Sequence, residues 1–151
     1  NTAVSYLNGA VTAGDFVSRI DYKIDSNYAE VNDNDTRIAY SSMNYLNNAS
    51  GYISNDCRYS NIANAHGQFA FTGTGIQWIG SKNTDHGMAN VYIDGVLDAT
   101  VDTYGTNAKQ QVLYTKTGLS AGSHTIKIVV TNTKNASSSG YYQDIDAFRY
   151  K

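Results

Sequence analysis

Acidic and amide side chains cluster at two points that lie far apart along the sequence. The stretch VNDNDTR, residues 31–37, contains consecutive oxygen-bearing side chains, namely Asn32, Asp33, Asn34, Asp35 and Thr36. The stretch YYQDIDAF, residues 141–148, adds Asp144 and Asp146. Carboxylate, amide and hydroxyl oxygens are the ligands that hard cations such as calcium prefer. The two stretches therefore indicate a calcium ion with a structural role, which would hold the first and last strands of the fold together.

A second interpretation of residues 31–37 needs no metal. Asn and Asp side chains hydrogen-bond to their own backbone in turns, so the segment also fits a turn capped by its own side chains. It resembles half of an EF-hand loop but lacks the glycine and the terminal glutamate, so that motif does not apply. For residues 31–37 alone, the capped turn is the better interpretation. Once Asp144 and Asp146 are considered as well, the capped turn and the calcium site are about equally well supported.

No local pattern indicates catalysis. A glycosidase would need two carboxylates facing each other across a cleft. None of the available carboxylates has a context that marks an acid or a nucleophile, whether at the only glutamate, Glu30, or at Asp33, Asp35, Asp85, Asp144 and Asp146. H-E-x-x-H and C-x-x-C motifs are missing from the sequence. GLSAG, residues 118–122, has the spacing G-x-S-x-G, but it separates two expected strands and is interpreted as a turn, not as a nucleophile elbow. The only cysteine, Cys57, is best explained as a small buried hydrophobic residue. We therefore expect a protein that is not an enzyme.

The elements that must position these side chains are β-strands. Apolar residues alternate with other residues around Phe69 and Phe71, around Val91 and Ile93, and from Ile126 to Val130, which is the period of half-buried strands. Helical periodicity is nearly absent. These features predict an all-β sandwich of the jelly-roll type. We expect strands near residues 15–24, 28–31, 36–41, 57–60, 68–72, 75–80, 88–94, 97–103, 110–115, 123–131 and 141–150.

Turn signals separate several of these strands. Asp94-Gly95 is a strong two-residue hairpin signal. The sequence GTG, residues 73–75, predicts another turn, across which Ile76 and Trp78 would share a sheet face with Phe69 and Phe71. Trp78, the only tryptophan, is then expected in the core and not as a platform for a ligand.

Several polar loops are expected to meet at one end of the sandwich. If neighbouring strands run antiparallel from residue 68 onward, loops 81–87, 104–109 and 132–139 share that end with the segment before residue 68. Its amides, hydroxyls and charges suit the recognition of sugar hydroxyls, although loops are polar in most proteins. The residues concerned are Asn61, Asn64, His66, Lys82, Asn83, Asp85, His86, Tyr104, Asn107, Lys109, Asn132, Lys134, Asn135 and Ser137 to Ser139. The long polar loop 42–56 is a further candidate for function.

Composition excludes two kinds of partner. The net charge is −2 and basic residues do not cluster, so nucleic acid is not expected to bind. No apolar run approaches the roughly 20 residues of a membrane span, so no membrane partner is expected. The polar composition, with 13 tyrosines and 13 glycines, suits a secreted, extracellular bacterial module, and the start at Asn1 suits a fragment of a larger protein. We expect a single domain over residues 1–151, in which residues 1–27 supply a first strand or part of a linker.

Most of the chain resembles a known family. The segments VNDNDTRIAYSS, FAFTGTGIQWIG, HGMANVYIDGVLDATVDTY and QQVLYTKTGLSAGSHTIKIVVTNTKNASSSGYYQDIDAF are similar to carbohydrate-binding modules of the galactose-binding-like superfamily. Such modules are appended to bacterial polysaccharide-degrading enzymes, and the resemblance covers about residues 28–150. It implies a β-sandwich that binds a polysaccharide or oligosaccharide without catalysis and keeps a covalently attached catalytic domain near its substrate.

The resemblance also implies particular residues. A structural calcium, frequent in such modules, would map to Asp33, Asp35, Thr36 and Asp146. Asn135 occupies the place of a polar ligand-binding residue before the last strand. Similar modules often carry a tryptophan soon after an I-x-Y-S strand, whereas Tyr45 stands in that region here, so any stacking role would fall to Tyr45.

The residues available favour a pocket for one sugar ring over a row of aromatic platforms. We predict a terminal galactose or a related pyranose such as arabinopyranose, with one aromatic face against the ring. Hydrogen bonds would come from Arg58, Lys82, Asp85, His86 and Asn135, and stacking from Tyr45 or Tyr104. Two alternatives stay open: a structural or adhesive module with an apolar patch on one sheet face, and a small hydrolase.

Overall fold

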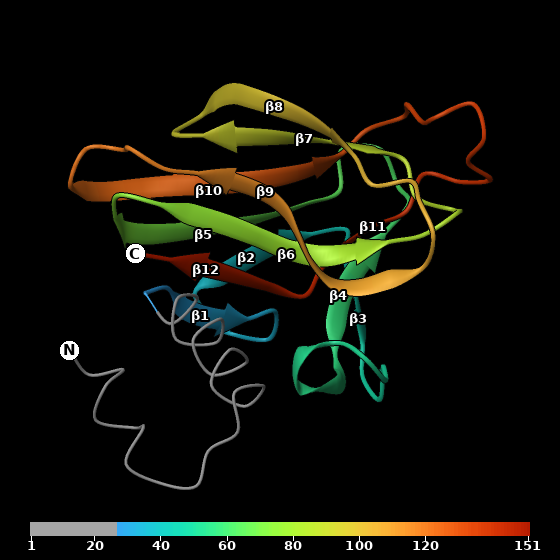
Figure 1. The fold of residues 1–151 in the computed structure, drawn as a ribbon, viewed down its shortest axis with the longest axis horizontal. Coiled ribbons are helices and arrows are strands. Elements are labelled where there is room, and N and C mark those ends of the chain that lie inside the picture. The colour runs from blue at the N-terminus through green and yellow to red at the C-terminus, as the bar shows by residue number, and fades with distance from the viewer. Residues whose placement is uncertain (1–26) are drawn as a thin grey trace, which may run out of the picture.

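The structure is a computed structural model that describes residues 27–151, so the strand expected at 15–24 lies outside the described residues (Figure 1). Two large antiparallel sheets face each other, and a small third sheet lies below one end of them in the view of Figure 1. The all-β sandwich predicted from the sequence is confirmed. No helix among residues 27–151 is long and apolar enough to cross a bilayer.

The strand order of each sheet follows from the pairing register. The four-stranded sheet runs β1 (Ala29–Asn32), β12 (Ala147–Tyr150), β6 (Ile76–Lys82) and β9 (Ala108–Lys116). The five-stranded sheet runs β2 (Ile38–Ser41), β5 (His66–Gly73), β10 (Gly122–Val130), β7 (Met88–Ile93) and β8 (Val96–Asp102). The small sheet runs β11 (Gln143–Ile145), β4 (Cys57–Ser60) and β3 (Asn44–Leu46), and a short 3₁₀ turn, η1 (Ile53–Asn55), precedes β4.

The core lies between the inner faces of the two large sheets. Burial alternates along the strands, as in β10, where Ile126 and Ile128 are buried and Lys127 is not. Trp78 is 0% exposed, which confirms its predicted place in the core, and its indole N–H donates to the carbonyl of Asp144 (3.0 Å). Phe69 from one sheet stacks on Phe148 from the other, with ring centroids 5.6 Å apart. These aromatic contacts join the sheets by burying large apolar surfaces.

The GTG turn connects the two sheets and does not close a hairpin. β5 belongs to the five-stranded sheet and β6 to the four-stranded sheet, so the expected hairpin pairing of Phe69 and Phe71 with Trp78 is wrong. These residues meet across the core instead. The turn is held by the C-terminus, where Lys151 exchanges backbone hydrogen bonds with Gly75 (3.0 and 3.1 Å).

The last expected strand, 141–150, is split in two. β11 pairs with β4 in the small sheet and β12 pairs with β6 in the four-stranded sheet. The break falls at Asp146, whose backbone N–H donates to the carbonyl of Ile79 (2.9 Å). Because the chain changes sheets at this point, the side chains of Asp144 and Asp146 reach two different polar clusters.

Candidate functional site

Three buried carboxylates from distant segments form an acidic cluster, which we define as Asp33, Asp56 and Asp146. Asp33 follows β1, Asp56 precedes β4, and Asp146 joins β11 to β12. Their exposed fractions are 0%, 4% and 0%. The side-chain amide of Asn32 donates to Asp33 and to Asp56, at 3.0 Å each, and so ties two of them together. Ile53 in η1 donates its backbone N–H to Asp146 (2.9 Å).

The cluster raises the affinity of two of its carboxylates for protons. Burial, a hydrogen bond that protonated Asp33 donates to Asp56, and the charge of Asp56 raise the pKa of Asp33 to about 8. Burial is also the main reason why the pKa of Asp146 rises to about 7. Burial acts the same way on Asp56, but hydrogen bonds from Asn32 and Tyr45 outweigh it and hold the pKa of Asp56 below its usual value. The charge of Arg58 opposes this rise at Asp33, and a bound cation would favour the charged forms of both carboxylates further.

Three oxygens at this cluster suit a hard cation. Oδ1 of Asn32, Oδ2 of Asp33 and Oδ2 of Asp146 are buried without a hydrogen-bond partner among the described residues. Such groups are rare in proteins and call for a water or an ion. Across residues 27–151, no group of three or more Asp, Glu, His or Cys side chains is arranged to hold a metal by itself. A calcium ion here would need amide or backbone oxygens besides the carboxylates, as is common for this ion.

The acidic cluster differs from the ligand set predicted from the sequence. Asp35 turns away from it, because both of its carboxylate oxygens accept hydrogen bonds from Arg37 (2.9 and 3.0 Å). Thr36 is exposed in the same turn. Asp56, which the sequence analysis did not select, stands with Asp33 and Asp146 instead. Its position at the end of the long polar loop 42–56 was the one available signal.

Arg58 and Tyr45, both predicted to bind a sugar, lie beside the acidic cluster. They are paired residues of β4 and β3. The guanidinium of Arg58 lies between two tyrosine rings, 4.9 Å from the centroid of Tyr40 and 4.8 Å from that of Tyr45. Its Nε is 4.0 Å from Oδ2 of Asp33. Tyr45 donates its hydroxyl to Asp56 (2.8 Å) and is 45% exposed, so one ring face contacts Arg58 and the rest of the ring is open to a ligand.

The other predicted sugar-binding residues lie at the loop end, which we define as loops 83–87, 103–107 and 131–142. Figure 1 shows these connections at one end of the sandwich, opposite the C-terminus and the β7–β8 hairpin. Bridges between Asn83 and Tyr104 and between His86 and Tyr142 join the loops. Asn135 donates its side-chain amide to Asp102 (3.2 Å). The segments that carry Lys82, Asp85, His86, Tyr104 and Asn135 are thus brought together, as the strand directions predicted.

Beneath the loop end lies a buried polar group of side chains centred on Asp144. The carboxylate of Asp144 accepts hydrogen bonds from the backbone N–H and hydroxyl of Ser81 and from the hydroxyl of Tyr52 (2.9 Å to Tyr52). His86 is buried, and its Nε2 is 3.8 Å from Asp144 Oδ2 and from Asp85 Oδ1. Asp85 Oδ1 and His86 Nδ1 have no hydrogen-bond partner among the described residues. Asp85 and His86 therefore present unused polar atoms directly below the surface loops.

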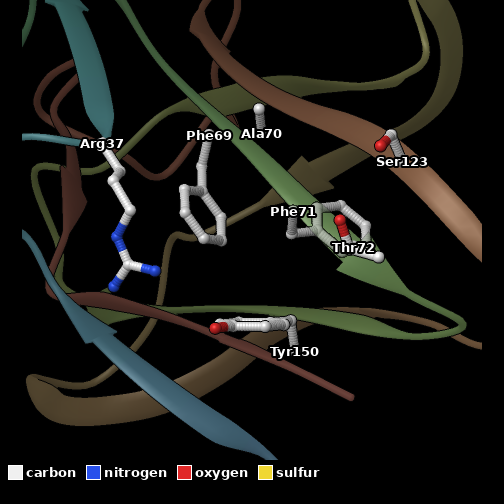
Figure 2. Close-up of a pocket in the computed structure, with 7 residues that line it drawn as sticks. All are labelled: Arg37, Phe69, Ala70, Phe71, Thr72, Ser123 and Tyr150. Atoms are coloured by element: carbon white, nitrogen blue, oxygen red, sulfur yellow. The ribbon is translucent and has the colours of Figure 1, made fainter.

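A notch of about 290 Å³ lies where β2 begins beside β5. Figure 2 shows Phe69, Phe71 and Tyr150 around it, with the guanidinium of Arg37 extending along one side. Phe69 and Phe71 are 1% and 5% exposed, so their rings belong to the edge of the core. Arg37 is already paired with Asp35 (2.9 Å). The charged group of the notch is therefore already paired, and its other polar side chains are the hydroxyls of Thr72, Ser123 and Tyr150.

The chain is similar to short parts of two larger enzymes, and no protein-family model matches it. Both enzymes come from Flavonifractor plautii: an A type blood N-acetyl-alpha-D-galactosamine deacetylase (37% identical over 102 residues) and an A type blood alpha-D-galactosamine galactosaminidase (35% over 127 residues). The matches cover 68% and 84% of this chain but only 13% and 11% of those enzymes. The chain thus corresponds to a small segment of each relative.

Solved structures of similar fold include carbohydrate-binding modules. A family 35 carbohydrate binding module from an environmental isolate aligns with a TM-score of 0.56 and 20% identity, over 80% of this chain and 90% of that chain. The CBM36-1 domain of a multidomain xylanase from the hindgut metagenome of Trinervitermes trinervoides aligns with a TM-score of 0.56 and 17% identity, over 82% and 95%. The chain has the β-sandwich fold of carbohydrate-binding modules, which confirms the resemblance found in the sequence.

Proposed function

We propose that this chain is a non-catalytic glycan-binding module whose loop end binds a terminal galactose or a related pyranose. In its parent protein it would hold a covalently attached, secreted, glycan-degrading enzyme near its substrate. The observation that carries this proposal is the convergence of Lys82, Asp85, His86, Tyr104 and Asn135 on one end of a carbohydrate-binding fold. The names of the two related enzymes refer to galactosamine, a sugar of the same configuration, which supports the choice of ligand.

The geometry of the loop end suits a single ring. Tyr104 is half-buried and offers an aromatic face, while Lys82 is exposed beside it and can donate to hydroxyls. The carboxylate of Asp85 is 43% exposed and can accept hydrogen bonds from the sugar. Because few atoms would be buried, we expect a dissociation constant on the order of 10 µM to 1 mM. Several modules in one parent protein would raise the avidity.

We also propose that the acidic cluster binds a calcium ion with a structural role. Asp33, Asp146 and Asn32 supply the unpartnered oxygens, and Asp56 lies beside them. The ion would neutralise the negative charge of these carboxylates. It would also stabilise the folded state, because it would bind that state only. Asp35 accepts hydrogen bonds from Arg37, so the calcium site would use Asp56 in place of Asp35.

Glycan-array screening followed by calorimetry with galactose, with and without a chelator, tests the proposal. Asp85→Ala should abolish galactose binding while the circular dichroism spectrum and melting temperature stay close to those of the wild type. Glu30→Gln, which removes a carboxylate from the exposed pair with Arg149 on β1, is the matched control and should bind normally. The proposal is wrong if no plant or microbial glycan on a broad array binds.

One observation favours the second candidate, a structural or adhesive module. Val96, Leu97 and Val112 are 69%, 51% and 48% exposed, and they lie on β8 and β9, the edge strands of the two large sheets. Tyr114 of β9 donates its hydroxyl to Asp98 of β8 (2.6 Å), so the two edges lie together. Val96 and Leu97 point to opposite faces of β8, so exposed apolar side chains flank this edge, and such side chains suit contact with another domain. This candidate predicts that no sugar binds and that Leu97→Asp weakens a domain contact.

A further inference from the structure

A second concave surface lies on the outer face of the five-stranded sheet and runs from the β7–β8 turn toward the loop end. This sheet-face groove has a volume of about 410 Å³, within the range of small-ligand sites. Its lining comes from β5, β10, β7 and the adjoining turns, and consists of Asn64, His66, Tyr92, Gly95, Lys127 and Val129. The alternation of burial along β7 and β10 places Tyr92, Lys127 and Val129 on the face opposite the core.

The pairing register fixes the neighbours within the groove. Lys127 of β10 is directly opposite Tyr92 of β7, and Val129 is directly opposite His66 of β5. Side chains opposite each other on one sheet face have Cβ atoms about 5 Å apart. An aromatic ring and an ammonium group therefore stand side by side in the centre, with an apolar side chain and an imidazole next to them.

The groove carries positive charge without a compensating carboxylate. None of its lining residues is acidic, although the chain as a whole has a net charge of −2. Asp94, next to Gly95, is already bound to His124 (2.7 Å) and to the backbone N–H of Thr125 (2.8 Å). Among residues 27–151, Lys127 takes part in no ion pair. Its ammonium group can therefore pair with an anion from a ligand.

Gly95 and Asn64 form the two ends of the groove. A Cβ atom built on Gly95 would meet nothing within 4 Å, so the turn does not close that end. At the other end, the backbone of Asn64 adopts a left-handed conformation (φ 72°), and its carbonyl contacts His66 Nδ1 (3.0 Å). The amide of Asn64 is exposed and can bind hydroxyl groups.

We propose that the sheet-face groove is a second sugar site, which takes a pyranose carrying one anionic group, either a carboxylate or a sulfate. Tyr92 stacks on the apolar face of the ring, Lys127 pairs with the anionic group, and Asn64 and His66 bind hydroxyls. This site differs from the galactose site at the loop end, because Tyr92 and Lys127 at its centre lie on the sheet face and none of its lining residues is among Lys82, Asp85, His86, Tyr104 and Asn135.

Nuclear magnetic resonance titration of the whole chain tests this site with three probes: methyl β-glucuronide, methyl galactoside 6-sulfate and uncharged methyl galactoside. We expect one or both anionic probes to shift the backbone amides of Tyr92, Lys127 and Val129, and the probe that does so identifies the anion. Lys127→Gln should weaken that binding about tenfold, the loss expected for one charge-assisted hydrogen bond. Tyr92→Ala should weaken it similarly, and Tyr92→Phe, which keeps the ring, should not.

The matched control is Lys116→Gln, which removes the same charge from β9 in the other sheet, where Lys116 pairs with Asp98. It should leave the affinity for the anionic probes unchanged. The proposal is overturned if both anionic probes leave the groove amides unshifted, or if Lys127→Gln binds them as tightly as Lys116→Gln does. The uncharged galactoside reports on the loop end separately, so the failure of one site is distinguishable from the failure of the other.

Discussion

Asp33 and Asp146 lie side by side, with the backbone N–H of Asp33 donating to the carbonyl of Asp146 across 3.0 Å. Each carboxylate buries its Oδ2 without a hydrogen-bond partner among the described residues. The chain brings together residues 113 positions apart (146 − 33) because β1 and β12 pair at the edge of one sheet. Buried carboxylates of this kind are favoured when they are protonated or when positive charge compensates them, and Arg58 lies 4.0 Å from Asp33.

The first prediction concerns this pair and pH. The pKa values of Asp33 and Asp146 are raised to about 8 and about 7 in the folded protein, from 3.8. Between the unfolded and folded values the folded state binds more protons, so stability falls as pH rises. We expect the melting temperature of chelator-treated protein to be lower at about pH 8.5 than at about pH 5.5. Calorimetry in the presence of EDTA measures this difference.

Calcium should reverse the trend, because the ion replaces the protons and binds more tightly when they are gone. The added stability from calcium should therefore be larger at the higher pH. Asp146→Asn should lose most of the calcium response, whereas Asp98→Asn on β8, which removes a carboxylate paired with Lys116, should keep it. A melting temperature that is unchanged by calcium and by chelation at both pH values would refute a structural calcium in the acidic cluster.

The second prediction concerns the close contact between loops at Gly140. A Cβ atom at this position would lie 2.8 Å from the carbonyl oxygen of Asp85, too close for the loops to stay in place. We expect Gly140→Ala to displace loop 83–87, to weaken galactose binding, and to lower stability by about 1–3 kcal/mol. Calorimetric titration and thermal unfolding measure the two effects. Gly105→Ala is the control in a neighbouring loop, since its Cβ would meet only the side chain of Lys82 at 3.4 Å.

The third prediction concerns Trp78. Its side chain is 0% exposed, and its indole N–H donates to the carbonyl of Asp144. Trp78→Phe removes this hydrogen bond and leaves a small cavity, so we expect a loss of about 2–4 kcal/mol in the free energy of unfolding. Chemical denaturation followed by circular dichroism measures it. Surface substitutions change the free energy of unfolding by less than about 0.5 kcal/mol. A loss in that range would contradict a role of Trp78 in stabilising the core.

Local sequence signals predicted the parts of the fold that depend on neighbouring residues. Asp94-Gly95 closes the β7–β8 hairpin with positive φ at both residues (51° and 80°), as this dipeptide favours. The alternation of Ile126 and Ile128 correctly placed β10 and its buried face. The GTG turn was misassigned because glycines mark a reversal of the chain but not the sheet to which the next strand belongs.

The candidate sites depend on contacts between distant residues, which explains what the sequence did not reveal. Asp35 looks equivalent to Asp33 in the sequence, but only the structure shows that Arg37 takes both of its oxygens. Asp56 lies 23 positions beyond Asp33 (56 − 33) and joins it through the amide of Asn32. The groove around Tyr92 and Lys127 depends on the register of three strands, which no local pattern specifies.

The last prediction concerns the ion pair of His124 and Asp94, which braces the end of the sandwich opposite the loop end. His124 Nδ1 lies 2.7 Å from Asp94 Oδ2, and its Nε2 lies 2.6 Å from the carbonyl oxygen of Ser120. The Ser120 carbonyl and the Asp94 carboxylate raise the pKa of His124, and the hydrogen bonds from His124 and Thr125 lower the pKa of Asp94.

The stability due to His124 is therefore complete below the pKa of the unfolded state and is lost as pH rises through the pKa of the folded state. The stability due to Asp94 is lost in the opposite direction, as pH falls through its own folded pKa. We expect the difference in melting temperature between the wild type and His124→Gln to be largest at about pH 5–6 and to shrink by about pH 9. Asp94→Asn, which removes the partner of His124, should remove the same pH dependence. If the difference in melting temperature between the wild type and His124→Gln stays constant across this pH range, His124 stabilises the turn by packing alone.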